Sequence, residues 1–416
     1  MTTENIEALA TRGRSLIRWA ERRMPALALF KSELEARRSL RGLKIGGSLH
    51  LTPETAALAR CLRAAGAEVV LSGSNPLSTR DEICASLVRD DKIEVFAHYG
   101  EDPASYHDHL RSIAAKAPDI VLDDGADLIA YMAQRKAKPG TIGIEQTTTG
   151  IQRLRGMETA GVLPFPVIAL NDAPLKQEFD NNYGTGQNTI DGILRATNIL
   201  IAGKTVVVAG YGWVGKGIAS RMRGHGANVI VTEINAVRAL HAYYDGFRVL
   251  PMAEAAPLGD VFVTATGCRE VVAEPHFGLL KDGAVLANSG HFDVEIDVGA
   301  LARIALERDE IRPNLVELTI PGGKHLYILG QGRLVGHSAA EASPADVMDL
   351  TFTLMAMTVE WVATRPIELP TNSKVIPSPT EFTERVASTK LAAVGVAHDR
   401  LTASQREYIQ SWDVGT

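Results

Sequence analysis

One glycine-rich turn limits the possible folds of this chain more than any other feature. The segment Gly210-Tyr211-Gly212-Trp213-Val214-Gly215 follows an apolar run, Thr205 to Ala209, and precedes a helical pattern. In a strand–turn–helix unit of this kind, the first glycine permits the tight turn and the second lets a pyrophosphate approach the backbone. The third lets the helix pack closely on the strand. The segment therefore predicts a dinucleotide-binding unit.

The end of the next predicted strand indicates which dinucleotide is bound. That strand, Val229 to Thr232, is followed by Glu233, 18 residues after Gly215. A carboxylate in this position accepts a hydrogen bond from the adenosine ribose 2′-hydroxyl and repels a 2′-phosphate. We therefore expect NAD rather than NADP as the cofactor.

Short apolar strands alternate with helical segments through most of the chain. The first predicted strand, Leu43 to Ile45, turns through Gly46 to His50 and enters a helix with Thr52 as its N-cap and Pro53 as its first residue. Further strands are predicted at 68–71, 120–122, 167–170, 205–209, 229–232, 261–264 and 285–288. This rhythm predicts the α/β class, with two doubly wound, Rossmann-like parallel sheets and a helical C-terminal tail.

The order of these segments predicts how the chain is divided. Residues 1–182 together with 337–385 are expected to form a substrate-binding and catalytic domain, and residues 183–336 the NAD-binding Rossmann domain. Residues 386–416 are expected to form a C-terminal oligomerisation tail. Ligands bind open α/β sheets at the carboxyl ends of the strands, and the polar residues predicted there are His50, Asn75, Asp123-Asp124, Glu145 to Gly150 and Asn171-Asp172.

Composition excludes several classes of protein. The formal charge of −6 is spread along 416 residues, so we expect neither nucleic-acid nor membrane partners. No apolar run approaches the roughly 20 residues that cross a bilayer. Three cysteines without a C-x-x-C pattern indicate reduced thiols, a cytoplasmic location and no metal site. The arginine-rich N-terminus carries interleaved glutamates, which are atypical of a transit peptide.

A set of longer motifs carries a resemblance to a known family. The motifs are 47–52 (Gly-Ser-Leu-His-Leu-Thr), 123–128, 147–150, Lys176 with 179–181, 210–217 and 290–297. Together they resemble the adenosylhomocysteine hydrolase family over about Gly47 to Trp361. Trp213, Gly184 to Gln187 and the ending Ser411-Trp412 are similar to the shorter archaeal or thermophile-type branch of that family.

The resemblance implies an enzyme that retains its NAD. Transient oxidation of a ribose 3′-hydroxyl makes the C4′ proton acidic, a base removes that proton, and the 5′ substituent leaves. Water then adds and the sugar is reduced again, so NAD is a true catalyst. The implied default substrate is S-adenosylhomocysteine, and the implied assembly is a homotetramer.

The resemblance also assigns roles to individual residues. Lys176, with Asp180 and Asn181, would face the 3′-hydroxyl, where a lysine acts as the base for alcohol oxidation. Asp124 and His50 would handle the C4′ proton and the leaving group, and His291 would lie near the nicotinamide. Expected substrate contacts are Thr52, Glu54, Gln146 and Ser343. Expected cofactor contacts are Thr147, Thr148, Thr149, Gly210, Gly212, Trp213, Val214, Gly215, Glu233, Arg238, Thr266, Ser289 and Gly290.

Three departures from the family pattern fall near this expected site. Gln146 replaces a glutamate that contacts ribose hydroxyls, Gly336 in Leu334-Val335-Gly336-His337 replaces the asparagine of Leu-Val-Asn-Leu, and Ser343 replaces the histidine of a Gly-His-Pro loop. Sites that hydrogen-bond a substrate lose discrimination when a partner is removed. We therefore predict poor turnover of adenosylhomocysteine and a better purine nucleoside substrate.

Two alternatives to the default reaction remain open at this stage. The first alternative is a divergent paralogue that acts as a lyase or dehydratase on another adenine nucleoside. The second is a non-catalytic NAD-binding regulatory protein. The regulatory alternative is disfavoured because Lys176, Asp180, Asp124, His50 and His291 are all present.

Overall fold

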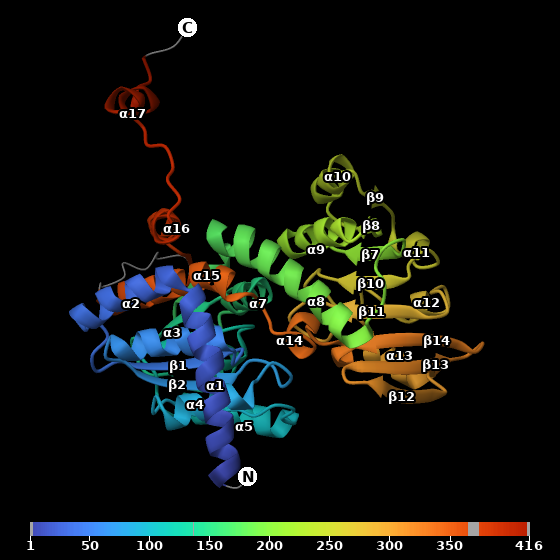
Figure 1. Ribbon diagram of the computed structural model, residues 1–416, viewed down its shortest axis with the longest axis horizontal. Coiled ribbons are helices and arrows are strands. Elements are labelled where there is room, and N and C mark those ends of the chain that lie inside the picture. The colour runs from blue at the N-terminus through green and yellow to red at the C-terminus, as the bar shows by residue number, and fades with distance from the viewer. Residues whose placement is uncertain (1–2, 136, 365–373, 414–416) are drawn as a thin grey trace.

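Two α/β domains, each with its own sheet, form the body of the molecule (Figure 1). The computed structural model describes residues 3–135, 137–364 and 374–413. The two sheets and their interleaved helices confirm the predicted fold class.

The first domain has a seven-stranded sheet in the order β15-β6-β5-β4-β1-β2-β3, and all its neighbouring strands are parallel. Its strands are β1 (Lys44–Leu49), β2 (Glu68–Gly73), β3 (Glu94–Phe96), β4 (Ile120–Asp123), β5 (Ile142–Glu145), β6 (Val167–Ala169) and β15 (Val375–Pro377). Its helices are α1 (Thr3–Arg23), α2 (Pro25–Arg37), α3 (Pro53–Ala64), α4 (Asp81–Arg89), α5 (Pro103–Ala115), α6 (Asp127–Ala133), α7 (Thr148–Thr159), α15 (Ala345–Thr364) and α16 (Thr380–Ala393).

The second domain has an eight-stranded sheet in the order β12-β13-β14-β11-β10-β7-β8-β9. Its strands are β7 (Thr205–Ala209), β8 (Asn228–Thr232), β9 (Arg248–Val249), β10 (Val261–Thr264), β11 (Ala284–Asn288), β12 (Glu307–Arg312), β13 (Leu315–Ile320) and β14 (Lys324–Leu329). Its helices are α8 (Thr185–Thr197), α9 (Trp213–Gly224), α10 (Ala236–Tyr244), α11 (Met252–Ala255), α12 (Glu274–Phe277), α13 (Val298–Ile304) and α14 (Val335–Ser338). Short helical segments are η1 (Leu170–Asp172), the π-helix η2 (Lys176–Gly184) and η3 (Gly330–Gly332).

One edge of the second sheet was not predicted from the sequence. β12, β13 and β14 form an antiparallel meander, and β14 joins the parallel part of the sheet beside β11. An antiparallel extension of this kind is common at the edge of large α/β sheets. It lies on the far side of β11 from the glycine-rich turn after β7.

The predicted turn from Gly46 to His50 is wrong, because β1 continues through both glycines to Leu49. A Cβ on Gly46 would lie 2.7 Å from Ile113 Cγ2, and a Cβ on Gly47 would lie 2.8 Å from Leu71 Cδ2. These glycines therefore allow close packing on both faces of a central strand instead of a change of direction. His50 follows the strand directly and lies at its carboxyl end.

Helix α15 is a buried core helix of the first domain. It is long and apolar enough to cross a membrane by length and composition, but 67% of its most apolar window is buried in the protein. Asp349, within this helix, accepts hydrogen bonds from the backbone amides of Ala26 and Leu27 and from Lys390 Nζ. A buried carboxylate at the N-terminus of α2 satisfies amides that the helix itself leaves unpaired.

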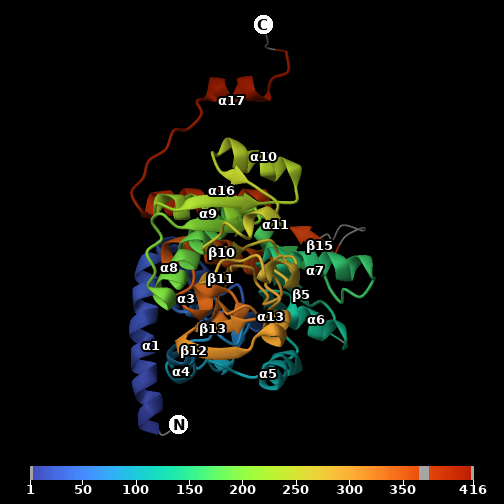
Figure 2. The same ribbon diagram turned by 90° about the vertical axis from the view of Figure 1, so that its right-hand side faces the viewer.

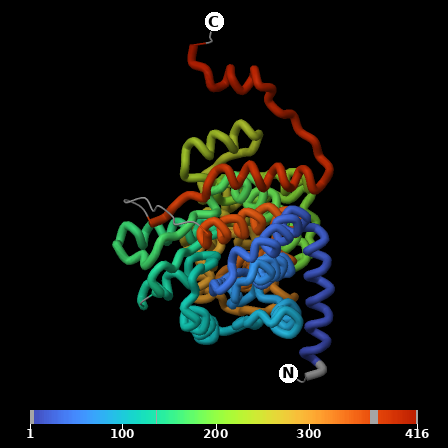
Figure 3. The backbone as a smooth tube through the Cα atoms, turned by 90° about the vertical axis from the view of Figure 1, so that its left-hand side faces the viewer, coloured from blue at the N-terminus to red at the C-terminus, as the bar shows by residue number. Residues whose placement is uncertain are grey.

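The termini lie on the outside of the body. α1 packs against α3 and α4 along one side of the first domain, and the segment after α16 leaves the body toward α17 (Ala403–Gln410) (Figures 2 and 3). None of the side chains of α17 is buried. The domain boundaries and the oligomerising role of this tail stay predictions.

Candidate active site

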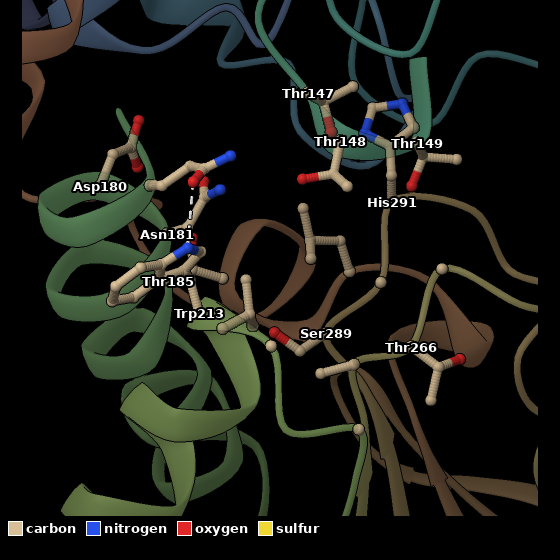
Figure 4. A pocket seen from close by; sticks show the side chains of 18 of the residues that line it. Thr147, Thr148, Thr149, Asp180, Asn181, Thr185, Trp213, Thr266, Ser289 and His291 are labelled. Carbon is tan, nitrogen blue, oxygen red and sulfur yellow. Dashed lines mark hydrogen bonds between the residues drawn. The ribbon is translucent and has the colours of Figure 1, made fainter. Parts of the chain in front are cut away.

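A cavity of about 970 Å³ is lined by residues of both domains. First-domain residues enter it from the carboxyl ends of β1, β4 and β5, and second-domain residues enter it from the turns after β7, β8, β10 and β11. In Figure 4, Asp180 and Asn181 face the opening from η2, opposite Thr147, Thr148 and His291. The cavity therefore lies where open α/β sheets bind ligands.

The three glycines of the second-domain turn have different surroundings. Gly210 has φ +94°, and a Cβ there would lie 2.6 Å from Ala265 O. A Cβ on Gly215 would lie 1.9 Å from Gly210 O, so this residue permits helix α9 to approach the turn. Gly212 faces open space, with its nearest neighbour, Arg238 Nη1, at 4.0 Å. The turn thus forms an open cradle at the N-terminus of α9, which fits the pyrophosphate of NAD.

Glu233 lies beside this cradle at the end of β8. Its Oε2 accepts a hydrogen bond from Tyr211 N at 2.7 Å, and its Oε1 accepts one from Asn235 N at 2.9 Å. The carboxylate therefore holds the glycine-rich turn and lines the cavity at the same time. This position suits recognition of the adenosine ribose of NAD.

The loop after β10 is held by a buried carboxylate that the sequence analysis did not identify. Glu295 accepts hydrogen bonds from Thr266 N, Thr266 Oγ1 and Gly267 N at 2.8 to 2.9 Å. Nearby, Ser289 Oγ lies 2.7 Å from Thr189 Oγ1 of α8. These contacts fix the predicted cofactor residues Thr266 and Ser289 at the cavity wall.

A lysine–aspartate pair lies in the π-helix η2. Lys176 Nζ is 2.6 Å from Asp180 Oδ2 and 3.2 Å from Asn181 Oδ1. Asp180 also accepts hydrogen bonds from Ser343 Oγ at 3.2 Å and Thr351 Oγ1 at 2.9 Å. Together these polar contacts hold the ammonium group at the cavity wall. π-Helical turns are rare and often occur at functional sites.

Asp124 lies between two histidines. Its Oδ2 is 3.5 Å from His50 Nε2, and its Oδ1 is 3.6 Å from His291 Nδ1. Burial alone would raise the pKa of Asp124, but the two imidazoles and a hydrogen bond from Gln146 lower it below its ordinary value. Burial lowers the pKa of His50 to about 4. The carboxylate is therefore ionised and His50 neutral near neutral pH, which suits both as proton acceptors.

Two features bring His291 to Asp124. Gly125 has φ +108°, and a Cβ there would lie 2.2 Å from His291 Nε2, so glycine is needed at this position. Glu145, which is fully buried, accepts hydrogen bonds from Gly125 N and Thr147 N. Burial and the neighbouring Asp123 and Asp124 raise the pKa of Glu145 well above its ordinary value. Glu145 acts here by positioning the loop.

Most of the predicted site residues meet in this cavity. Glu54 and Gly215 do not line it, because the Glu54 side chain is buried and Gly215 packs beneath the turn. The others do, and they are His50, Thr52, Asp124, Gln146, Thr147, Thr148, Thr149, Lys176, Asp180, Asn181, Gly210, Gly212, Trp213, Val214, Glu233, Arg238, Thr266, Ser289, Gly290, His291 and Ser343. A separate group, His98, Glu101 and His109, has the spacing of metal ligands but lies outside the cavity, so the prediction of no metal stays open.

Comparisons with known proteins identify the family. Residues 3–143 match S-adenosyl-L-homocysteine hydrolase, and residues 181–342 match its NAD-binding domain. The chain belongs to the S-adenosyl-L-homocysteine hydrolase family. NAD is its cofactor, as the glycine-rich turn and Glu233 predicted.

Full-length relatives agree with this membership. The chain is 52% identical to an adenosylhomocysteinase of Gloeobacter violaceus, with 99% of this chain and 96% of that protein aligned. It is 51% identical to one of Aquifex aeolicus and 49% identical to one of the archaeon Saccharolobus solfataricus, each with 98% of both chains aligned. A dipicolinate synthase chain from Bacillus halodurans shares the fold at a TM-score of 0.50 and 13% identity, covering 79% of this chain and 100% of that one.

The structure shows what lies beside Gly336. A Cβ on Gly336 would lie 2.0 Å from Asn188 Oδ1. Asn188, on α8, thus fills the space beside Gly336 and donates a hydrogen bond to Ser343 Oγ at 3.3 Å. Asn188 does not line the cavity, so the expectation that the site lacks an asparagine amide here stays a prediction.

Gln146 also has a role beyond the expected sugar contact. Its Nε2 donates a hydrogen bond to Asp124 Oδ2 at 2.6 Å, which a carboxylate in its place would not do. Its Oε1 is buried and has no hydrogen-bond partner among the described residues.

His337 is the main cavity residue that the sequence analysis missed. It lies in the short helix α14, lines the cavity, and its ring centroid is 4.1 Å from that of His50. The available signal was the histidine in Leu334-Val335-Gly336-His337, at the second leucine of the family's Leu-Val-Asn-Leu run. The sequence pattern indicated only the loss of the asparagine at residue 336, although the histidine beside it is also a change.

Proposed function

We propose that this chain cleaves S-adenosylhomocysteine to adenosine and homocysteine by transient oxidation of the ribose. The observation that supports this proposal is that the Lys176–Asp180 pair and the Asp124–His50–His291 cluster line one cavity with the glycine-rich turn. NAD, when bound, accepts the hydride from C3′ and later returns it. The relatives named adenosylhomocysteinase support this substrate.

In the proposed oxidation, Lys176 in its neutral amine form accepts the proton of the 3′-hydroxyl. Asp180 accepts a hydrogen bond from the lysine nitrogen at 2.6 Å and so orients the amine. Asn181 fixes the same group from a second side and is itself held by a hydrogen bond to Asn171 Oδ1. The three side chains provide a preorganised base at one end of the cavity.

In the proposed elimination, Asp124 and His50 handle the C4′ proton. The low pKa of Asp124 and the neutral state of His50 make both available as acceptors. Ser78 Oγ at 2.6 Å and Ser74 Oγ at 3.2 Å fix His50 Nδ1, so His50 Nε2 faces Asp124. His291 approaches the other oxygen of Asp124 and lies by the expected nicotinamide position.

Turnover of adenosylhomocysteine tests this proposal directly. The purified protein should contain bound NAD, and adenosylhomocysteine should generate NADH absorbance followed by free homocysteine and adenosine, detected by mass spectrometry. Bound NAD that no purine nucleoside reduces would contradict the proposal and support the non-catalytic, regulatory alternative.

A second candidate is a divergent paralogue that acts on another adenine nucleoside and stops after elimination. It is favoured by the cavity wall, where Ser343 and Gln146 replace the histidine and the glutamate of the family pattern and so change the polar contacts offered to a substrate. The same mass-spectrometric assay should include the inosine analogue and hydroxymethyl-substituted adenine nucleosides. Faster conversion of one of these to an alkene would favour the paralogue, whereas efficient homocysteine release would favour the hydrolase.

Assembly and location complete the proposal. We propose a homotetramer in the cytoplasm, with the exposed helix α17 and the tail around it contacting a neighbouring protomer. The exposed Tyr408, Ile409 and Trp412 support this role because large apolar side chains on an isolated segment favour burial in an interface. Light scattering of the full chain and of a chain ending at residue 398 would test it, since loss of the tail should lower the mass of the assembly.

A further inference from the structure

His337 places a third imidazole at the elimination end of the cavity. Its Nδ1 is buried and has no hydrogen-bond partner among the residues that the structure describes. A buried polar nitrogen without a partner costs about 1 to 3 kcal/mol. The ring of His337 lines the cavity, so a nucleoside bound there lies against this imidazole.

The groups that face His337 limit its charge. His50 packs against it at 4.1 Å between ring centroids, His291 lies 5.9 Å from His50, and Lys176 and Arg80 contribute positive charge. Burial and these neighbours lower the pKa of His337 well below its ordinary value. Asp124 is the carboxylate that contacts this group of imidazoles, through His50 and His291. One carboxylate supports one added proton, so His50 and His337 would not both be charged.

This chain and the family pattern have histidine at different positions of this wall. The family pattern has leucine at 337 and histidine at 343, whereas this chain has His337 and Ser343. The two positions belong to one folded segment, because Ala342 N donates a hydrogen bond to Gly336 O at 2.9 Å. The wall therefore keeps one histidine but holds it against His50.

We propose that His337 is an additional catalytic acid, which passes a proton to an oxygen leaving group at C5′. This inference rests on the proposed oxidation and elimination chemistry. In the step, the C4′–H bond of the 3′-keto sugar breaks and its proton passes to the neutral His50–His337 pair, so that one imidazole of the pair becomes protonated. The C4′=C5′ bond forms, the C5′–O bond breaks with its electron pair, and the departing oxygen takes that proton from the protonated His337. The His50–His337 pair is then neutral again, as it began.

The chemistry of the leaving group explains why such an acid matters. A thiol has an ordinary pKa of about 8.5, so sulfur leaves readily as thiolate. Water is a far weaker acid than a thiol, so hydroxide leaves readily only when it is protonated. Because the pKa of His337 is low, this imidazole is neutral in the resting site. Once it receives a proton, it is a strong enough acid to pass that proton on. His337 thus suits an adenine nucleoside with a hydroxyl at C5′ more than a thioether.

Three measurements on the NAD-loaded protein separate the steps. Adenosine in H₂¹⁸O reports loss and return of the 5′-oxygen, deuterium entry at C4′ reports proton abstraction, and NADH absorbance reports oxidation. His337→Leu, which restores the family residue, should lower ¹⁸O exchange by about 100-fold or more, within the range for general acids. NADH formation, C4′ exchange and thiol release from adenosylhomocysteine should stay within about threefold.

A control variant and a second substitution at His337 separate a catalytic defect from a folding defect. His325→Leu, at a half-buried strand position outside the cavity, is the control for loss of a histidine. If His337→Leu loses its NAD, His337→Gln keeps a polar side chain without a transferable proton and should show the same defect. Unchanged ¹⁸O exchange, or an equal fall in C4′ exchange, would overturn the inference. Absence of NADH in the wild-type protein with either nucleoside would instead overturn the proposed function.

Discussion

The two ends of the cavity differ in how completely their polar atoms are paired. At the oxidation end, Lys176, Asp180 and Asn181 bond to one another and to Asn171, Ser343 and Thr351. At the elimination end, Gln146 Oε1 and His337 Nδ1 are buried and have no partners among the described residues. The first end is paired without a ligand, whereas the second contains buried polar atoms that no described residue pairs.

This difference separates chemistry from specificity. Every nucleoside that is oxidised at C3′ presents the same hydroxyl to Lys176, so that end can be rigid. Leaving groups differ between substrates, and two departures from the family pattern, Gln146 and His337, lie at the other end. Ser343, in contrast, contacts Asp180 at the oxidation end. Members of one family can thus share the oxidation step and differ in the elimination step that follows it.

The largest expected effect is at the oxidation end. Lys176→Ala removes the proposed base and leaves Asp180 without its counter-ion, so NADH formation from adenosine should fall by about 10³-fold. Stopped-flow absorbance of the NAD-loaded protein measures it. Lys138→Ala, at an exposed ion pair with Asp119, is the control. NADH formation at the wild-type rate would show that Lys176 is not the base.

The second prediction concerns the elimination end. Asp124→Asn and His50→Ala should form NADH within about threefold of the wild type but slow deuterium entry at C4′ by about 100-fold, because the proton acceptors are lost after oxidation. Mass spectrometry of recovered adenosine gives the exchange rate. Equal loss of NADH formation in these variants and in Lys176→Ala would mean that the two ends do not act separately.

The sequence predicted the oxidation end almost completely. Lys176, Asp180 and Asn181 fall within one short segment, so a motif match carries their mutual contacts. The parallel strands, the glycine-rich turn and the cofactor were also predictable, because they depend on local pattern and spacing. The sheet extension formed by β12 to β14 was missed because its pairing depends on partners distant in sequence.

The elimination end was predicted residue by residue but not as an arrangement. Gly336, Asn188 and Ser343 come from segments about 150 residues apart, and only their packing shows that Asn188 occupies the space beside Gly336. Similarly, the role proposed for His337 depends on its contact with His50, which is 287 residues away in the sequence. Contacts of this kind between distant segments are not visible in one sequence without coordinates.

A third, smaller effect concerns the cofactor half. Glu233→Gln should weaken NAD binding by about 10- to 100-fold, since a hydrogen bond to a charged group contributes about 1.5 to 3 kcal/mol. It should also narrow the preference for NAD over NADP, because the repulsion of a 2′-phosphate is lost. Calorimetry of the NAD-free protein with each dinucleotide measures both. A wild-type preference for NADP would contradict the assignment of Glu233.

The smallest effect is expected from Gln146→Glu. Asp123, Asp124 and Glu145 already crowd carboxyl groups into this end, and the Gln146 amide helps to hold the pKa of Asp124 below its ordinary value. A fourth carboxylate would raise that pKa. Because ionised Asp124 is needed to accept the C4′ proton, the acid limb of the pH profile for C4′ exchange should move to higher pH. The loss should be several-fold at low pH and vanish at high pH. Gln134→Glu, at the end of α6 and outside the cavity, should leave the profile in place. If Gln146→Glu lowers the rate equally at every pH, then Gln146 acts through the sugar and not through Asp124.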